Sequence, residues 1–247
     1  MKSSVSFPFR TLWIVTLFFI AMGYIESAVV IYMREILYPG GFQFPLAPIE
    51  AHLAVTEIIR EFATLVVLLC IGMIAGRTFS EKFAWFLYSF AIWDIFYYVF
   101  LKLLIGWPES LMTWDILFMI PTTWVGPVIT PVIVSLTMIL LAMILVYYNC
   151  KNDIVKIRWI EWALLITGSI ILILSWTWDY SDYILEHFTF REIWTVPRED
   201  LYRIASEYIP RKFYWGLFWI GEVIIIAGIV YLWRRYAKDV KRETEGI

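Results

Sequence analysis

The sequence predicts an all-α integral membrane protein, a polytopic helical bundle with about six transmembrane helices. Apolar residues make up 61% of the 247-residue chain, and charged residues only 17%, below the roughly 25% that is usual in soluble domains. The charges are clustered and leave long apolar runs between them. A run of about 18 or more such residues can cross the hydrocarbon as a helix, which satisfies its own backbone hydrogen bonds. The sequence does not show the alternating strands of about ten residues that a membrane barrel requires.

The first span is predicted at residues 11–33. Lys2 and Arg10 precede its apolar core, as in a signal peptide, but the apolar run continues and no small-residue cleavage pattern follows it. We therefore expect a retained membrane helix. The whole chain is interpreted as a single transmembrane domain, residues 1–247, whose other five spans are predicted at residues 49–75, 83–105, 128–148, 159–178 and 213–233.

A broken segment precedes the fourth span. Pro121, Gly126, Pro127 and Pro131 interrupt an apolar stretch at residues 113–131. Proline removes a backbone donor and clashes with the preceding helical turn, so the pattern predicts a half-helix followed by a tight loop at membrane depth. Such backbone survives there only against protein or a water-filled cavity. The alternative is a short interfacial helix followed by an ordinary turn.

The longest polar segment, residues 179–212, separates the fifth and sixth spans. Within residues 197–210, proline begins a helical pattern, two acidic residues follow in its first turn, and apolar residues share one face. We expect an amphipathic helix that lies on the outer membrane surface or on the other spans.

The distribution of Lys and Arg predicts that both termini are cytoplasmic, in a plasma or inner membrane. The two terminal segments and the 2–3 and 4–5 loops hold twelve of these residues, whereas the short loops on the other side hold only Arg34 and Lys102. Cys70 and Cys150 then lie near the cytoplasmic side, where thiols stay reduced. A net charge of −2 gives no reason to expect a nucleic-acid partner, and two histidines give none to expect haem.

Six ionisable residues fall inside the predicted spans. A charge at the bilayer centre costs about 2.5–3.5 kcal/mol on insertion scales, so these side chains should face one another or a cavity. A rise of about 1.5 Å per residue places all the acids among them within one slab of the membrane, from its middle to its outer half. The residues are Glu26, Glu57, Arg60, Glu61, Asp94 and Glu222.

The candidate site comprises Glu26, Glu57, Arg60, Glu61 and Asp94. Glu57 and Glu61 are four residues apart on one helix face, with Arg60 beside them. One arginine cannot neutralise all these acids, so the surplus carboxyls must be protonated or balanced by a bound cation. Oxygen ligands suit protons or a hard divalent cation, for which Glu57, Glu61 and Asp94 are the candidate metal ligands. The sequence contains no zinc, phosphate-loop or serine-hydrolase motif.

Four more residues are candidates for supporting roles. Tyr97 and Tyr98 follow Asp94 on its own helix face and could orient it, although tyrosine is also common in the interfacial belt. Asp115 could cap the expected half-helix or form the mouth of a path. Glu222, taken alone, fits a carboxyl that hydrogen-bonds a neighbouring helix.

These features predict an intramembrane carboxylate–arginine cluster that binds or relays protons or a small cation, as in a transporter. A second hypothesis is an intramembrane enzyme that uses the same acids as metal ligands or acid/base groups on a lipid-like or quinone-like substrate. A third is a non-catalytic subunit of a larger membrane complex, whose helix packing the acids would fix. Beyond the lipid bilayer and such subunits the sequence indicates no partner.

Overall fold

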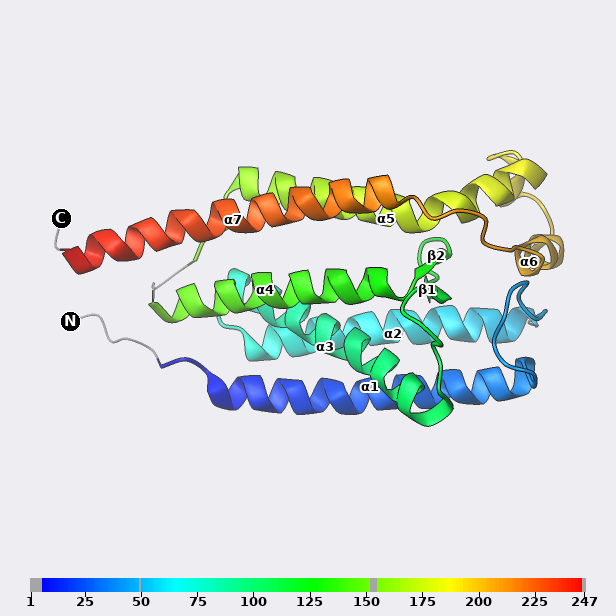
Figure 1. Cartoon of the computed structure of the whole chain (residues 1–247), viewed down its shortest axis with the longest axis horizontal. Helices are drawn as coiled ribbons and strands as arrows, with labels where there is room; N and C mark the ends of the chain where they lie inside the picture. The colour runs from blue at the N-terminus through cyan, green and yellow to red at the C-terminus, as the bar shows by residue number, and fades with distance from the viewer. Residues whose placement is uncertain (1–5, 49, 152–154, 246–247) are drawn as a thin grey trace.

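The chain forms a helical bundle in the computed structural model, which describes residues 6–48, 50–151 and 155–245 (Figure 1). Among these residues, six helices are long and apolar enough to cross a membrane, as the hydropathy predicts. The chain is therefore an integral membrane protein. The six helices are α1 (Phe9–Leu37), α2 (Ala51–Ala75), α3 (Phe79–Ile105), α4 (Ile129–Lys151), α5 (Trp159–His187) and α7 (Trp215–Glu245).

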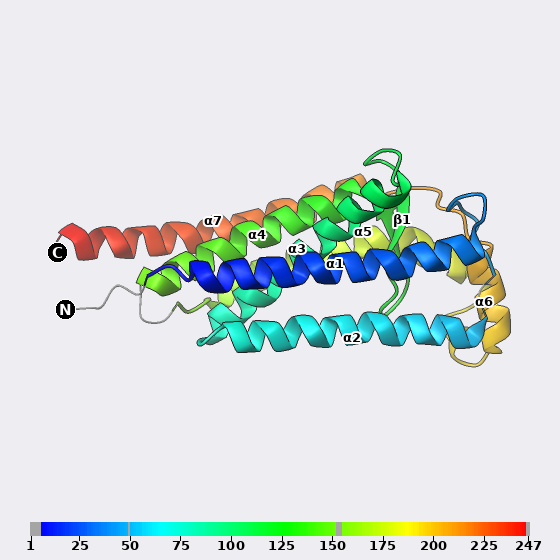
Figure 2. The same cartoon turned by 90° about the horizontal axis from the view of Figure 1, so that it is seen from below.

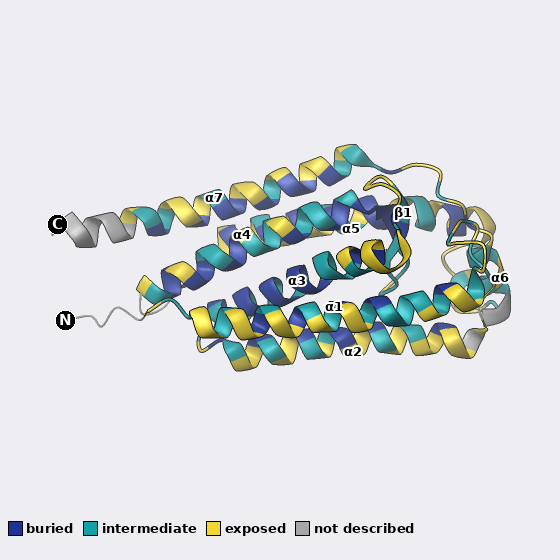
Figure 3. Cartoon of the chain, turned by 60° about the horizontal axis from the view of Figure 1, so that its bottom comes forward, coloured by how far each residue is buried: buried dark blue, intermediate teal, exposed yellow. Residues whose placement is uncertain are grey.

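The helices pack as two groups. Helix α3 lies among α1, α2 and α4 and contacts all three, whereas α5 packs along α7, which also contacts α4 (Figures 1 and 2). Large buried side chains, among them Phe19, Trp85 and Phe218, fill the interior. The outer faces of α1 and α2 carry many of the exposed residues (Figure 3), which is the pattern expected where lipid covers a helix.

Glycines allow α5 and α7 to approach closely. A Cβ atom added at Gly168 would lie 2.8 Å from the carbonyl oxygen of Gly221, and one added at Gly221 would lie 2.9 Å from that of Gly168. Helices in lipid gain no hydrophobic burial by associating, so close backbone contact through small residues supplies much of their packing energy. The two glycines therefore account for the tight pairing of α5 with α7.

The segment before α4 is a β-hairpin, so the predicted half-helix was wrong. Strand β1 (Trp114–Phe118) pairs antiparallel with β2 (Trp124–Pro127), with an irregularity between Ile116 and Phe118. The hairpin places Pro121 in the turn, where no ladder donor is needed, and cross-strand pairing satisfies the backbone. A Cβ at Gly126 would lie 3.0 Å from Trp176, so glycine lets β2 lie against α5.

The hairpin lies toward the end of the bundle that carries the predicted amphipathic helix, and α1 and α2 extend past it, whereas α1 begins and α7 ends at the opposite end (Figures 1 and 2). That helix is α6 (Arg198–Ser206), preceded by the short turn η1 (Glu192–Trp194). The polar residues 179–187 belong to α5, which is longer than predicted, because a helix does not have to end where its apolar run ends. Asp179 of α5 instead binds the segment between α6 and α7. Its carboxylate accepts hydrogen bonds from the Tyr208 hydroxyl at 2.6 Å and the Arg211 backbone N–H at 2.9 Å.

Candidate functional site

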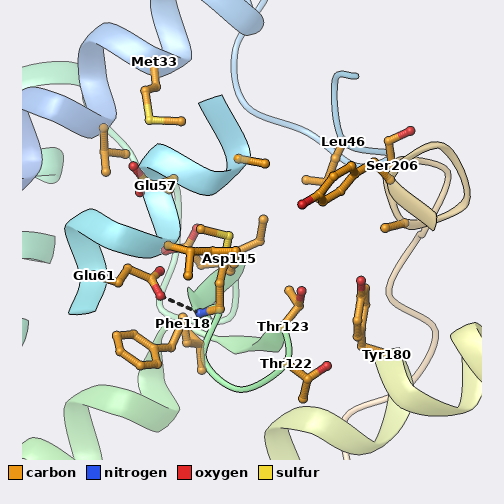
Figure 4. Close-up of a pocket in the computed structure, with 18 of the residues that line it drawn as sticks. Met33, Leu46, Glu57, Glu61, Asp115, Phe118, Thr122, Thr123, Tyr180 and Ser206 are labelled. Carbon is orange, nitrogen blue, oxygen red and sulfur yellow. Dashed lines mark hydrogen bonds between the residues drawn. The ribbon is translucent and has the colours of Figure 1, made fainter. Parts of the chain in front are cut away.

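A cavity of about 610 Å³ lies beside the hairpin, among α1, α2, α3, α5 and α6. Helices α4 and α7 contribute no residue to its lining. All five residues of the predicted site line it, and so do Tyr97, Tyr98 and Asp115. Figure 4 shows Glu57 and Glu61 of α2 on one side of this space, with Glu61 hydrogen-bonded to the hairpin turn, and Tyr180 and Ser206 on the other side.

Arg60 joins two acids from different helices. Its Nε donates to Glu57 at 2.9 Å, one terminal nitrogen pairs with the same carboxylate, and the other pairs with Glu26 of α1. The two acidic side chains are 12% and 13% exposed, and the arginine 23%. A planar guanidinium suits such a fork. This ion-paired trio therefore ties α1 to α2 along one edge of the cavity.

Glu61 and Asp94 have neutral donors instead. One oxygen of Glu61 accepts a hydrogen bond from the backbone N–H of Met119, in the turn of the hairpin, at 2.9 Å. One oxygen of Asp94 accepts from the Ser135 hydroxyl of α4 at 2.8 Å. Among the described residues neither forms an ion pair. These two carboxyls are therefore the ones available to a proton or to a cationic ligand.

Arg34, which the sequence analysis assigned to an outer loop, is a buried member of this site. It lies in the last turn of α1 and donates to Asp115 at 3.1 Å. Its guanidinium carbon lies 4.4 Å from the centre of the Phe42 ring and 3.7 Å from that of the Trp107 ring. Cation–π contacts of this kind stabilise a desolvated arginine. Phe42 follows soon after Arg34 in the sequence, but Trp107 and Asp115 are distant, so the sequence alone could not assign this role.

Asp115 is 2% exposed and lies in the hairpin, outside the spanning helices. Its second oxygen accepts from the Tyr98 hydroxyl at 3.3 Å. Burial raises the pKa of Asp115 to about 6, although Arg34, the Ile116 backbone and the Tyr98 hydroxyl each lower it. No half-helix exists for Asp115 to cap. The residue instead holds Arg34 at the edge of the cavity.

Glu222 lies elsewhere. It is 1% exposed, does not line the cavity, and accepts a hydrogen bond from Thr137 of α4 at 3.1 Å. This contact matches the packing role that the sequence analysis weighed for this residue alone. Within the described residues, its other oxygen has no hydrogen-bond partner.

The charge of the cavity lining is strongly unbalanced. Its charged members are five acids and two arginines, a formal charge of −3 when all are ionised. Burying uncompensated charge is costly, so the site must hold protons or a cation. In the part of the chain that the structure describes, no three His, Cys, Asp or Glu side chains converge to hold a metal ion. The acids are Glu26, Glu57, Glu61, Asp94 and Asp115, and the arginines are Arg34 and Arg60.

No protein-family model matches the chain, and neither a curated protein nor a solved structure matches it.

Proposed function

We propose that this integral membrane protein binds a small organic cation, an amine with an apolar portion, and exchanges it for protons, as in a transporter. The observation that carries this proposal is the formal charge of −3 gathered on the lining of one cavity of about 610 Å³. Protons or an inorganic ion alone do not need such a volume, which falls within the roughly 300–1,000 Å³ of pockets for organic ligands.

The rest of the lining suits the apolar portion. Trp93, Tyr97 and Phe118 offer aromatic surface near the acids, and aromatic faces attract organic cations. Ile58 of α2 and Ile184 of α5 also line the space. An amine could therefore set its charge against Glu61 and Asp94 while its hydrocarbon contacts apolar side chains.

Proton exchange follows from the charge. When the cavity is empty, surplus carboxyls are best neutralised by protons, and a bound ammonium group takes over that role. Cation binding should therefore release protons and strengthen as the pH rises. Glu61 and Asp94 are the expected exchange sites because the arginines already pair with Glu26, Glu57 and Asp115.

The test is isothermal titration of the protein in lipid nanodiscs with hexyltrimethylammonium, whose charge is permanent. Titrations in two buffers with different ionisation enthalpies count the protons released. We expect saturable binding with proton release, and at least about tenfold weaker binding when Glu61→Gln and Asp94→Asn are combined, since the attraction between two unit charges about 4 Å apart is roughly 4 kcal/mol at an effective dielectric constant of about 20. Glu222→Gln, a buried carboxyl outside the cavity, is the matched control and should bind normally.

Two results would overturn the proposal. One is equal binding of hexanol, the neutral analogue, because the carboxyls would then contribute nothing to recognition. The other is undiminished hexyltrimethylammonium binding in the double variant. Where binding is seen, proteoliposomes carrying an internal pH indicator should report proton movement when the cation is added, and the double variant should not.

A further inference from the structure

The cavity has a second polar end that carries no charge. All its charged lining residues come from α1, α2, α3 and β1, whereas the hairpin turn, α5 and α6 contribute hydroxyl groups. Figure 4 shows Thr122, Thr123, Tyr180 and Ser206 on the side away from Glu57 and Glu61. The hydroxyl end comprises Thr122, Thr123, Tyr180, Ser181, Tyr202 and Ser206.

Some of the hydroxyl groups at this end form no hydrogen bond that would hold the fold together. Ser and Thr in helices usually bond back to a carbonyl one turn earlier, as Thr64 and Thr177 do here. Over the described residues, the side chains of Thr122, Ser181 and Tyr202 make no hydrogen bond to the protein, although each lines the cavity. Polar groups in such a place need water or a ligand as partner.

The chemistry of this end selects a neutral group. Hydroxyls both donate and accept, so they suit an alcohol, amide or carbonyl. A second ammonium or an anionic group would lose its hydration there without meeting a countercharge, which is costly. Apolar side chains such as Ile58, Ile184 and Leu201 also line the cavity and suit a hydrocarbon spacer.

We infer that the ligand is a two-headed amphiphile, with an ammonium group for the carboxyls, a neutral hydrogen-bonding group for the hydroxyl end, and an apolar spacer between them. This inference rests on the proposed function and adds the second head group to it. An amino alcohol is the simplest such molecule. Its hydroxyl should add about three- to tenfold to the affinity, the amount expected from one hydrogen bond to a neutral partner.

The test compares three probe series of increasing chain length in the nanodisc titration: alkylamines, α,ω-amino alcohols and α,ω-diamines. At the chain length that spans the cavity, the amino alcohol should bind at least about threefold more tightly than the alkylamine, and the diamine no more tightly than the alkylamine. Combining Thr122→Val, Ser181→Ala and Tyr202→Phe should remove the advantage of the amino alcohol, whereas an alkylamine should still bind. Thr56→Val, on α2 outside the cavity, should preserve both affinities.

The outcomes separate the two proposals. Alkylamine binding without any advantage for an amino alcohol, at any chain length, would overturn the two-headed ligand and leave the amine site standing. An advantage that persists in the Thr122/Ser181/Tyr202 variant would equally overturn it, because the second head group would then be recognised elsewhere. Failure of every amine series to bind would overturn the proposed function itself, and the two-headed ligand with it.

Discussion

Arg60 should be the most sensitive side chain in the cavity lining. Arg60→Met removes the guanidinium that pairs with Glu26 and Glu57 and leaves two largely buried carboxylates unpaired. Breaking a buried ion pair from one side costs about 3–5 kcal/mol. Because Arg60 is 23% exposed, water screens part of that loss, so we expect the free energy of unfolding to fall by about 2–4 kcal/mol. The free energy of unfolding is measured by titrating the protein with SDS in mixed micelles and monitoring its helix content by circular dichroism.

Two further variants make this prediction specific. Adding Glu26→Gln and Glu57→Gln to Arg60→Met removes the stranded charges, so most of the lost stability should return. Arg203→Met breaks an exposed pair with Asp200, whose side chains are 65% and 51% exposed, and should cost no more than about 1 kcal/mol. The electrostatic argument is refuted if Arg60→Met costs no more than Arg203→Met, or if the triple variant is less stable than the single one.

Three other substitutions test the fold and the pH response. Gly168→Ala should lower the free energy of unfolding by about 1–3 kcal/mol in the same titration, because its Cβ would lie 2.5 Å from Ile225; Gly216→Ala, with open space around it, should not. The pKa of Asp115 is about 6 in the fold and about 3.9 when unfolded. Folding therefore favours the protonated form, and Asp115 should lower stability by roughly 3 kcal/mol as pH rises from about 4 to about 6; Asp115→Asn should remove this contribution, which is read from the difference between the wild-type and variant profiles. Glu161→Gln removes the negative charge of a carboxylate to which Arg235 donates hydrogen bonds at 2.7 and 2.8 Å. It should lower the free energy of unfolding by roughly 2 kcal/mol and leave amine binding normal.

The spans and the charged residues inside them could be predicted from the sequence. Both signals are strong because lipid penalises any exposed backbone or charge by several kcal/mol, and few arrangements avoid that penalty. The same argument could not place Arg34. At the end of α1 it could lie in water at little cost, and its burial depends on Asp115 and Trp107, which the fold brings from distant positions, together with Phe42 in the loop that follows α1.

The hairpin was missed for a related reason. Prolines show where a helix stops, but they do not show how the freed backbone is satisfied. Strand pairing became available because the turn at residues 119–123 lets β1 and β2 meet, and because Gly126 lets β2 approach Trp176. The hydroxyl end depends on this turn, so it too could not be found in the sequence, where Thr122 and Thr123 look like ordinary loop residues.

Glu61 and Glu222 show what decides whether an intramembrane acid belongs to a site. Both are glutamates near the middle of a span, and the sequence gives them equal depth. Helix pairing separates them: α2 packs on α3 and turns Glu61 toward the hairpin and the cavity, whereas α7 packs on α5 and turns Glu222 toward Thr137. Comparing Glu61→Gln with Glu222→Gln therefore holds residue type and depth nearly constant and varies only access to the cavity. A difference in cation binding between these two variants must then come from the cavity and not from a general effect of neutralising a buried acid.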